Sequence, residues 1–557
     1  MVSLDGIPTE LVGQICSFLS TGDILSLCGS SKSIYPIVHP LLFRHITIQW
    51  DQFTAPDEPP NITSLLQFLL RNPSYATHVK TLDIPNVVCN ACVAWSRHLK
   101  SSPWHWSPED TALVWPAIER CRLAHAHRWY TAVVEEAELG AIISLVLALC
   151  THLQSLTVDA SFIPASNGWF SDVFRPVIVP SLSVPEPPAR PLLFPNLTHI
   201  TVSQDDKRKL HPKYDPQRDM FYGGDYEEPH DEPPEALFLF FYLPRLTTLR
   251  FGYKPLSRYR HNWDPVAAGD ESLSWPVTAG SKGPLAASLT TLRLDCIMAP
   301  ADSLEFLLRR TPNLQSLVYD CVLSSSSTPL DLGVLRQALD HVGGTLTHLV
   351  IRYDIEAGEA VEPVSLSSVT TGRLGLLGTT LTALRDLEIS PFVLLGQVTP
   401  RAAPRLASVL PSGLRRLVLN DDLWHYEAFD AWQGEQVEAL LRDFLADGAW
   451  KTATPLLEEF ILEFVQDIES MDSALHKYWD DRANRASLRQ LVEDQRIRCA
   501  FRMYQGIEAR IRLGEHFYNG ADCKQYGEDA VARYKKFWEA ENGEEIPVDW
   551  VLEWLFD

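Results

Sequence analysis

Apolar residues near the start of the chain recur with the period of an α-helix. Leu11, Ile15 and Leu19 stand four residues apart after a proline, which fits a helix start because a first-turn N–H has no partner there. Two more short helices are predicted, one after the capping residues 20–23 and one over 32–38. A domain below about 40 residues seldom buries its apolar residues without a staple or partner. The stripe therefore predicts either a docking face for another protein or a first layer packed on the rest of the chain.

The same segment has a specific order of residues. Ile7-Pro8-Thr9-Glu10-Leu11-Val12 is followed at fixed offsets by Ile15, by Phe18-Leu19 and by Asp23-Ile24-Leu25-Ser26-Leu27. In this order and spacing the segment resembles an F-box, whose family pattern begins with Leu-Pro-x-Glu. It departs from the pattern at Ile7, at Gly29-Ser30 and at Ile34-Tyr35, where the family often has Leu, Val-Ser and Trp. The next residues, 41–48, resemble the strand that follows F-boxes in many fungal proteins.

The resemblance implies a partner and a function. An F-box docks on the Skp-type linker subunit of a cullin–RING ubiquitin ligase, and an apolar helix stripe suits a groove on such a partner. Carried over position by position, the linker-binding residues would be Pro8, Leu11, Ile15, Leu19, Ile24, Leu25 and Leu27. The chain would then be a substrate-recognition adaptor for ubiquitin-dependent degradation, with no catalysis and no cofactor of its own.

A second pattern, Leu-x-x-Leu-x-(Leu/Ile/Val), recurs through the middle of the chain. Its alternation of apolar and outward residues predicts strands with one buried face. Clear copies lie at 153–158, 197–202, 246–251, 289–294, 314–317, 346–351, 384–389, 414–419 and 457–462, and 79–84 is a plausible first member. The phrase resembles the strand segment of leucine-rich repeats, although its spacing is irregular against their period of about 20–29 residues. Helix-like segments such as 304–310 separate the copies.

These patterns together predict an α/β chain of three parts. A small all-α F-box would occupy 1–48, an irregular leucine-rich-repeat solenoid with loop insertions 49–465, and a helical C-terminal cap 466–557. The cap is predicted from charged helical runs and from an apolar terminus, 550–556, that would cover the last repeat. The alternative for that terminus is a peptide-like docking tail.

The outward strand residues of the solenoid would bind a protein substrate. They include Thr157, Thr201, Arg250, Arg293, Val350, Glu388 and Val418, of which Arg250, Arg293 and Glu388 are the candidate substrate-binding residues. Arg250 and Arg293 occupy equivalent positions in successive phrases. If they are adjacent, their guanidinium groups could clamp a carboxylate or phosphate. Otherwise they are ordinary surface arginines.

Composition limits the remaining choices. A formal net charge of −23 argues against nucleic acid as a partner, since phosphate binding needs clustered Lys and Arg. No apolar run is long enough for a membrane span, and the first residues do not resemble a secretory signal. Ten scattered cysteines in 557 residues fit reduced thiols. We expect an intracellular protein, cytoplasmic or nuclear, with no membrane partner.

Candidate chemistry is sparse. Cys89 and Cys92 have metal-ligand spacing, and Cys121 and His125 could supply two more ligands of a zinc site. No second tight pair accompanies them, so we expect buried cysteines, surface histidines and no metal. Nucleophile-elbow, Walker and His-Glu-x-x-His motifs are absent. The alternative to the ligase adaptor is therefore not an enzyme but a non-ligase leucine-rich-repeat scaffold that binds proteins.

Overall fold

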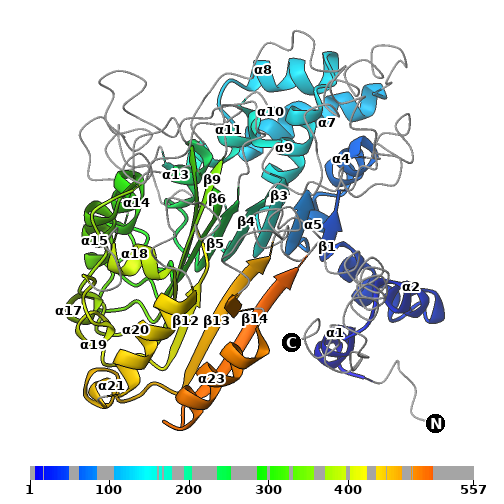
Figure 1. Cartoon of the computed structure of the whole chain (residues 1–557). Helices are drawn as coiled ribbons and strands as arrows, with labels where there is room; N and C mark the ends of the chain where they lie inside the picture. Colours follow the sequence, from blue (N-terminus) through cyan, green and yellow to red (C-terminus); the bar gives the residue numbers. More distant parts are fainter. Residues whose placement is uncertain are drawn as a thin grey trace, which may run out of the picture.

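The fold is organised by a parallel β-sheet of twelve strands (Figure 1). The computed structural model describes residues 7–16, 18–48, 62–84, 106–159, 162–165, 168–178, 194–203, 235–252, 285–297, 301–324, 330–356, 370–396, 402–422, 434–446, 448–466, 478–479 and 481–505. Strands follow one another across the sheet in sequence order, and every pair is parallel. Parallel neighbours cannot be joined by a tight hairpin, so a crossing segment must lie between them.

The strands are β1 (His45–Thr47), β2 (Thr81–Ile84), β3 (Ser155–Asp159), β4 (His199–Ser203), β5 (Thr248–Gly252), β6 (Thr291–Ile297), β7 (Ser316–Ser324), β9 (His348–Glu356), β11 (Asp386–Ile389), β12 (Arg416–Asn420), β13 (Glu459–Gln466) and β14 (Arg498–Gln505). A separate pair is formed by β8 (Leu330–Asp331) and β10 (Thr370–Thr371). From β2 to β13, each strand of the large sheet lies at one of the ten Leu-x-x-Leu phrases.

The helical segments before β3 are α1 (Thr9–Cys16), α2 (Thr21–Ser30), α3 (Tyr35–Val38), η2 (His39–Phe43), α4 (Ile62–Arg71), α5 (Pro73–Ala76), α7 (Pro108–Cys121), α8 (Ala126–Tyr130), η3 (Thr131–Glu135) and α9 (Leu139–Leu149). Those after β3 are α10 (Phe162–Ala165), α11 (Trp169–Ile178), α13 (Glu235–Phe240), α14 (Ala301–Leu308), α15 (Leu332–Asp340), α17 (Leu377–Thr380), α18 (Pro391–Leu395), α19 (Leu406–Val409), α20 (Gly434–Ala446), α21 (Ala449–Ala453) and α23 (Arg482–Glu493).

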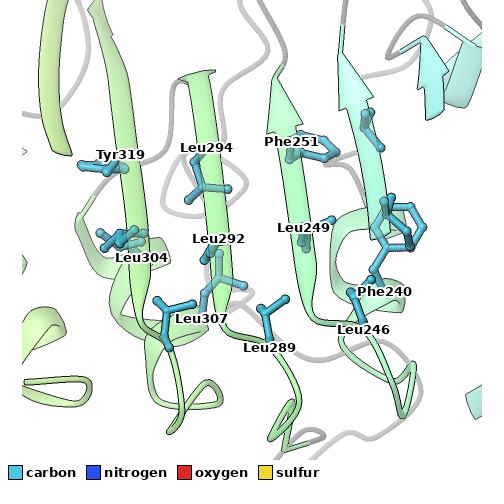
Figure 2. Packing of buried hydrophobic residues seen from close by; sticks show 14 of the residues in the cluster. Phe240, Leu246, Leu249, Phe251, Leu289, Leu292, Leu294, Leu304, Leu307 and Tyr319 are labelled. Atoms are coloured by element: carbon cyan, nitrogen blue, oxygen red, sulfur yellow. The ribbon is translucent and has the colours of Figure 1, made fainter. Parts of the chain in front are cut away.

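One apolar core joins the sheet to its helices. The second and third apolar residues of each phrase point the same way because side chains alternate along a strand. Figure 2 shows Leu292 and Leu294 of β6 beside Leu249 of β5. Leu304 and Leu307 of α14 belong to the same core, and all five side chains are almost fully buried. Each buried leucine contributes about 1.5–3 kcal/mol relative to an exposed one. The phrase therefore specifies both the strand and the face that the helices cover.

The predicted fold class was wrong. We expected a small all-α F-box, then a leucine-rich-repeat solenoid, then a helical cap, but the structure is an α/β fold built on one twelve-stranded parallel sheet. The first expected part is not all-α, because β1 pairs with β2. The expected cap is not all-helical either, because β14 pairs with β13 along eight residues. The apolar terminus 550–556 lies outside the described residues.

The reason for the error at the C-terminal side is local. Cys499 and Phe501 pack against the main core and alternate with Arg498, Ala500 and Arg502, which is strand periodicity. Their neighbours on both sides are rich in charge, and the segment lacks the leucines that mark the earlier strands. The short alternating run was therefore read as part of a charged helix.

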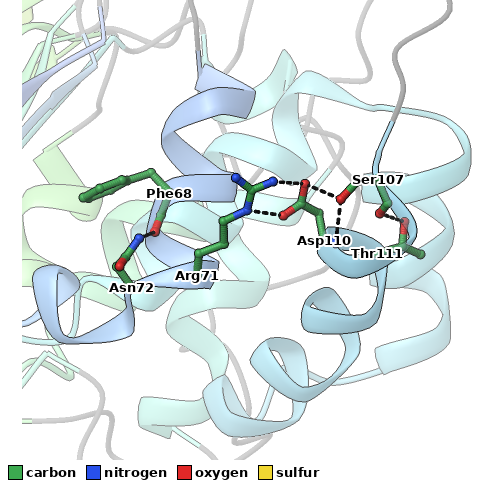
Figure 3. A network of polar contacts seen from close by, with 6 residues as sticks. All are labelled: Phe68, Arg71, Asn72, Ser107, Asp110 and Thr111. Carbon is green, nitrogen blue, oxygen red and sulfur yellow. Dashed lines mark hydrogen bonds and ion pairs between the residues drawn. The ribbon is translucent and has the colours of Figure 1, made fainter.

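A buried carboxylate ties α4 to α7. Arg71 donates from Nε and Nη2 to the two oxygens of Asp110, each at 2.7 Å, and Ser107 Oγ donates to the same carboxylate at 2.8 Å (Figure 3). Ser107 is also the N-cap of α7, accepting from the Asp110 N–H. The hydrogen bonds from Arg71 lower the pKa of Asp110. Ser107 thus caps α7 and Asp110 neutralises Arg71 of α4.

This ion pair gives a pH-dependent prediction. A carboxyl whose pKa is lower in the folded state stabilises the fold above its unfolded pKa of about 3.9, and that stabilisation is lost as the pH falls through the folded value. We expect Arg71→Gln to lower the apparent melting temperature at pH 7, and the gap from wild type to close as the pH is lowered below about 4. Melting curves from pH 7 to pH 3 check this. A gap that stays constant over that range would contradict it.

Candidate functional site

The first helices form a unit with its own small core. Ser20 caps α2 in a capping box, accepting from the Asp23 N–H at 3.2 Å while the Asp23 carboxylate accepts from the Ser20 N–H at 3.3 Å. The short helix α3 packs against both α1 and α2. The core of the unit consists of Val12, Cys16, Ile24, Cys28, Ile34 and Val38, and it is a cluster separate from the core of the sheet.

The other apolar residues of this unit face outward. The N-terminal apolar surface, as we call it, consists of Leu11 (49% exposed), Ile15 (43%), Phe18 (82%) and Leu25 (62%). A surface hollow is lined by Ile7, Pro8, Leu11, Gln14, Ile15 and Phe18. Leu11, Ile15 and Phe18 thus lie together, and monomeric proteins seldom leave neighbouring large apolar side chains exposed unless they bind something. Packing on the sheet, the alternative that the sequence left open, does not cover these side chains.

The structure sorts the predicted docking residues into three groups. Pro8, Leu11, Ile15 and Leu25 are exposed. Leu19 and Leu27 are half-buried and pack against the small core. Ile24 is a member of that core, so its side chain supports the unit from inside. Phe18 was not among the expected docking residues, although its place in the apolar stripe was a visible signal.

An aromatic joint attaches this unit to the sheet. Phe43 of η2 stacks on Phe68 of α4 at 4.9 Å between ring centroids, and it meets Tyr75 of α5 edge-on at 4.9 Å. His39 Nδ1 lies 2.9 Å from Tyr75 Oη. Aromatic pairs in such geometry add about 0.5–1.5 kcal/mol beyond area burial. The joint therefore holds the N-terminal unit at one edge of the sheet, where Figure 1 shows α1 and α2 standing beyond β1.

The outward strand residues lie in one row across the sheet. Register pairs connect Thr157 to Thr201, Thr201 to Arg250, Arg250 to Arg293, and then, through Val318, to Val350, Glu388 and Val418. Arg250 and Arg293, whose adjacency the sequence left open, are direct register partners on neighbouring strands.

The residues of this row differ in their burial and in their ion pairs. Glu388 is buried and forms an ion pair with Arg352 at 2.6 Å. Val318, Val350 and Val418 are buried as well, although they do not belong to the core between sheet and helices. Arg250 and Arg293 remain one-third exposed. Of the three candidate substrate-binding residues, the two arginines are thus the accessible ones.

One aspartate connects the two arginines. Arg250 Nε donates to Asp295 Oδ2 at 2.7 Å, and Arg293 Nε donates to Asp295 Oδ1 at 2.6 Å. The Asp295 side chain is 2% exposed. Gly252 stands opposite Asp295 in the register, and a Cβ there would lie 3.3 Å from the Asp295 Cβ, so glycine leaves room for this carboxylate. Sequence analysis found the arginine pair but not the aspartate between them.

The candidate zinc ligands are not brought together where the structure describes them. Cys121 is buried in α7, and burial raises the pKa of its thiol to about 11. His125 is exposed. Cys89 and Cys92 lie outside the described residues. Among the described residues, no group of three or more His, Cys, Asp or Glu side chains is placed to hold a metal ion.

Comparisons with known proteins add no relative. No protein-family model matches the chain, and no curated protein matches it. Within the described segments, no helix is both long and apolar enough to cross a membrane.

Proposed function

We propose that this chain is a substrate-recognition adaptor of a Skp–cullin–F-box ubiquitin ligase. Its N-terminal apolar surface docks on the Skp-type linker subunit, and the outward face of the sheet binds the protein to be modified. The observation that carries the proposal is the exposure of Leu11, Ile15, Phe18 and Leu25 on a helical unit with a separate core. The resemblance of residues 7–28 to an F-box names the partner.

The attachment of the unit supports the same function. An adaptor transfers nothing itself, so its contribution is to hold a substrate at high effective concentration in a suitable orientation. The stacking of Phe43 on Phe68 and the contact of His39 with Tyr75 limit rotation of the helices about β1. A linker subunit docked on α1 and α2 is then held in a defined direction from the sheet.

Co-purification of the full-length chain with a Skp-type linker subunit tests the proposal. We expect wild type to capture the linker and Leu11→Asp/Ile15→Asp to lose capture by at least about 100-fold, because two carboxylates would have to enter an apolar groove. Full-length variants are needed because removing residues 1–48 would also remove β1.

The matched control is Leu285→Asp/Leu376→Asp, which makes comparable changes at two exposed leucines outside the N-terminal unit. It should capture the linker like wild type. Failure of folded wild type to capture any Skp-type linker would overturn the ligase proposal, and the N-terminal apolar surface would then serve a different partner.

A further inference from the structure

The arginine pair lies among polar neighbours on the outward face of the sheet. Thr248 and Thr291 are two residues before Arg250 and Arg293 on the same strands, so their side chains leave from the same face. Thr201 stands beside Arg250 in the register. Guanidinium groups on adjacent strands are attached about 4.8 Å apart, a distance at which one small anion can contact both.

Asp295 fixes the two guanidinium groups without using all their donors. Each arginine contacts the carboxylate through Nε, and neither Nη pair donates a hydrogen bond to another side chain in the described part of the chain. Because the guanidinium group is planar and rigid, holding it at Nε also fixes the directions of its remaining N–H groups. An anion that binds those groups then orders the side chain little further. The side chains are 35% and 36% exposed, so these donors are within reach of solvent.

The cluster of Arg250, Arg293 and Asp295 differs from the other ion pairs of the same face in its numbers of cations and anions. Arg352 forms an ion pair with Glu388 and also stands opposite Asp320 in the register, which gives one cation and two anions. Arg416 and Arg498 share Glu459, and Asp386 stands beside Arg416 in the register, which gives two cations and two anions. The cluster of Arg250, Arg293 and Asp295 has two cations and one anion. Asp320 lies on the same face, opposite Arg352 in the register, so this count applies to Arg250, Arg293 and Asp295 alone.

From this geometry we infer that Arg250 and Arg293 bind an oxyanion, a phosphate monoester or a carboxylate, carried by a side chain of the bound protein. Guanidinium forks recognise both groups through paired N–H donors. Asp295 is a positioning residue: its carboxylate holds both guanidinium groups at Nε and reduces the repulsion between them. The inference rests on the proposed function in that it names what the substrate presents to the sheet.

The test uses the full-length chain without any linker subunit. Three degenerate peptide pools, with phosphoserine, glutamate or serine at the fixed centre, are applied to the immobilised chain at 0.15 M salt, where distant charges are screened beyond about 8 Å. We expect the phosphoserine pool, the glutamate pool or both to be retained about tenfold more than the serine pool, a difference equivalent to one good charge-assisted contact. The better-retained pool identifies the oxyanion.

Arg250→Lys/Arg293→Lys supplies the sharper comparison. Lysine keeps the charge and can neutralise Asp295, but it lacks the fork, so the preference for anionic pools should disappear. The single variants serve if the double variant does not fold, and each should weaken the preference. Arg415→Lys, at an exposed ion pair with Glu458, is the matched control and should retain it. Equal retention of all pools by wild type, or an undiminished preference in the lysine variants, would overturn the inference.

Because no linker subunit is present, this result is independent of the capture experiment. Loss of anion preference alone would leave the docking proposal intact, and loss of linker capture alone would leave the arginine site intact.

Discussion

Phe18→Ala is expected to weaken linker capture about 30-fold while leaving the fold unchanged. Phe18 is 82% exposed and lines the same hollow as Leu11 and Ile15. A protein seldom leaves a phenylalanine this exposed, and aromatic residues buried on binding are frequent hot spots, each worth about 2 kcal/mol or more. That energy corresponds to about 30-fold in the dissociation constant. Titration of purified linker subunit against immobilised chain measures it.

Phe18→Leu is the conservative comparison and should keep most of the affinity, since leucine still fills an apolar pocket. Circular dichroism and melting should not distinguish either variant from wild type, because the side chain makes little contact within the folded chain. Unchanged affinity in Phe18→Ala would mean that the linker approaches another part of the N-terminal unit. Reduced melting would mean that Phe18 has a structural role.

Sequence reasoning identified the strands better than the fold they form. The Leu-x-x-Leu phrases mark the strands because a parallel sheet covered on one face needs alternate apolar residues, and those are visible in a single sequence. How many strands join one sheet depends on pairing across distant segments, which periodicity does not contain. The pairing of β1 with β2 was missed for that reason, whereas β14 was missed because its short alternating run lies among charged residues.

In the candidate sites, too, features set by local spacing were predictable, and features set by the packing of distant segments were not. The capping role of residues 20–23 follows from local spacing and is seen at Ser20 and Asp23. The equivalent positions of Arg250 and Arg293 were visible in the sequence, but their adjacency was left open until the register was known. Burial is harder to predict on a helix as short as α2, where one residue of rotation decides whether a side chain faces inward. Asp295 was missed because an acidic residue two positions after an arginine carries no distinctive signal.

The N-terminal apolar surface and the arginine cluster belong to parts of the molecule that have separate cores. The core of the N-terminal unit is separate from the core of the sheet, and the aromatic joint is the contact between them described above. A change inside the small core should therefore disturb docking and leave the sheet folded. A change in the arginine cluster should affect the sheet face and leave docking intact.

Neighbouring residues of α2 test this separation. Ile24 is buried in the small core, whereas Leu25 is 62% exposed. Ile24→Asp places a carboxylate among apolar side chains at a cost of several kcal/mol, and small cores rarely supply more than about 3–5 kcal/mol. We expect the N-terminal unit to unfold. Leu25→Asp adds the same charge in solvent and should leave the unit folded.

Both variants should lose linker capture, for different reasons that hydrogen exchange can separate. In Ile24→Asp the amides of α1 and α2 should exchange rapidly while those of β3 to β13 stay protected, since the sheet keeps its own core. In Leu25→Asp all of these amides should remain protected. Unfolding of the sheet by Ile24→Asp would show that the two cores are energetically coupled, and the N-terminal helices would then act as the first layer of the sheet rather than as a separate docking unit.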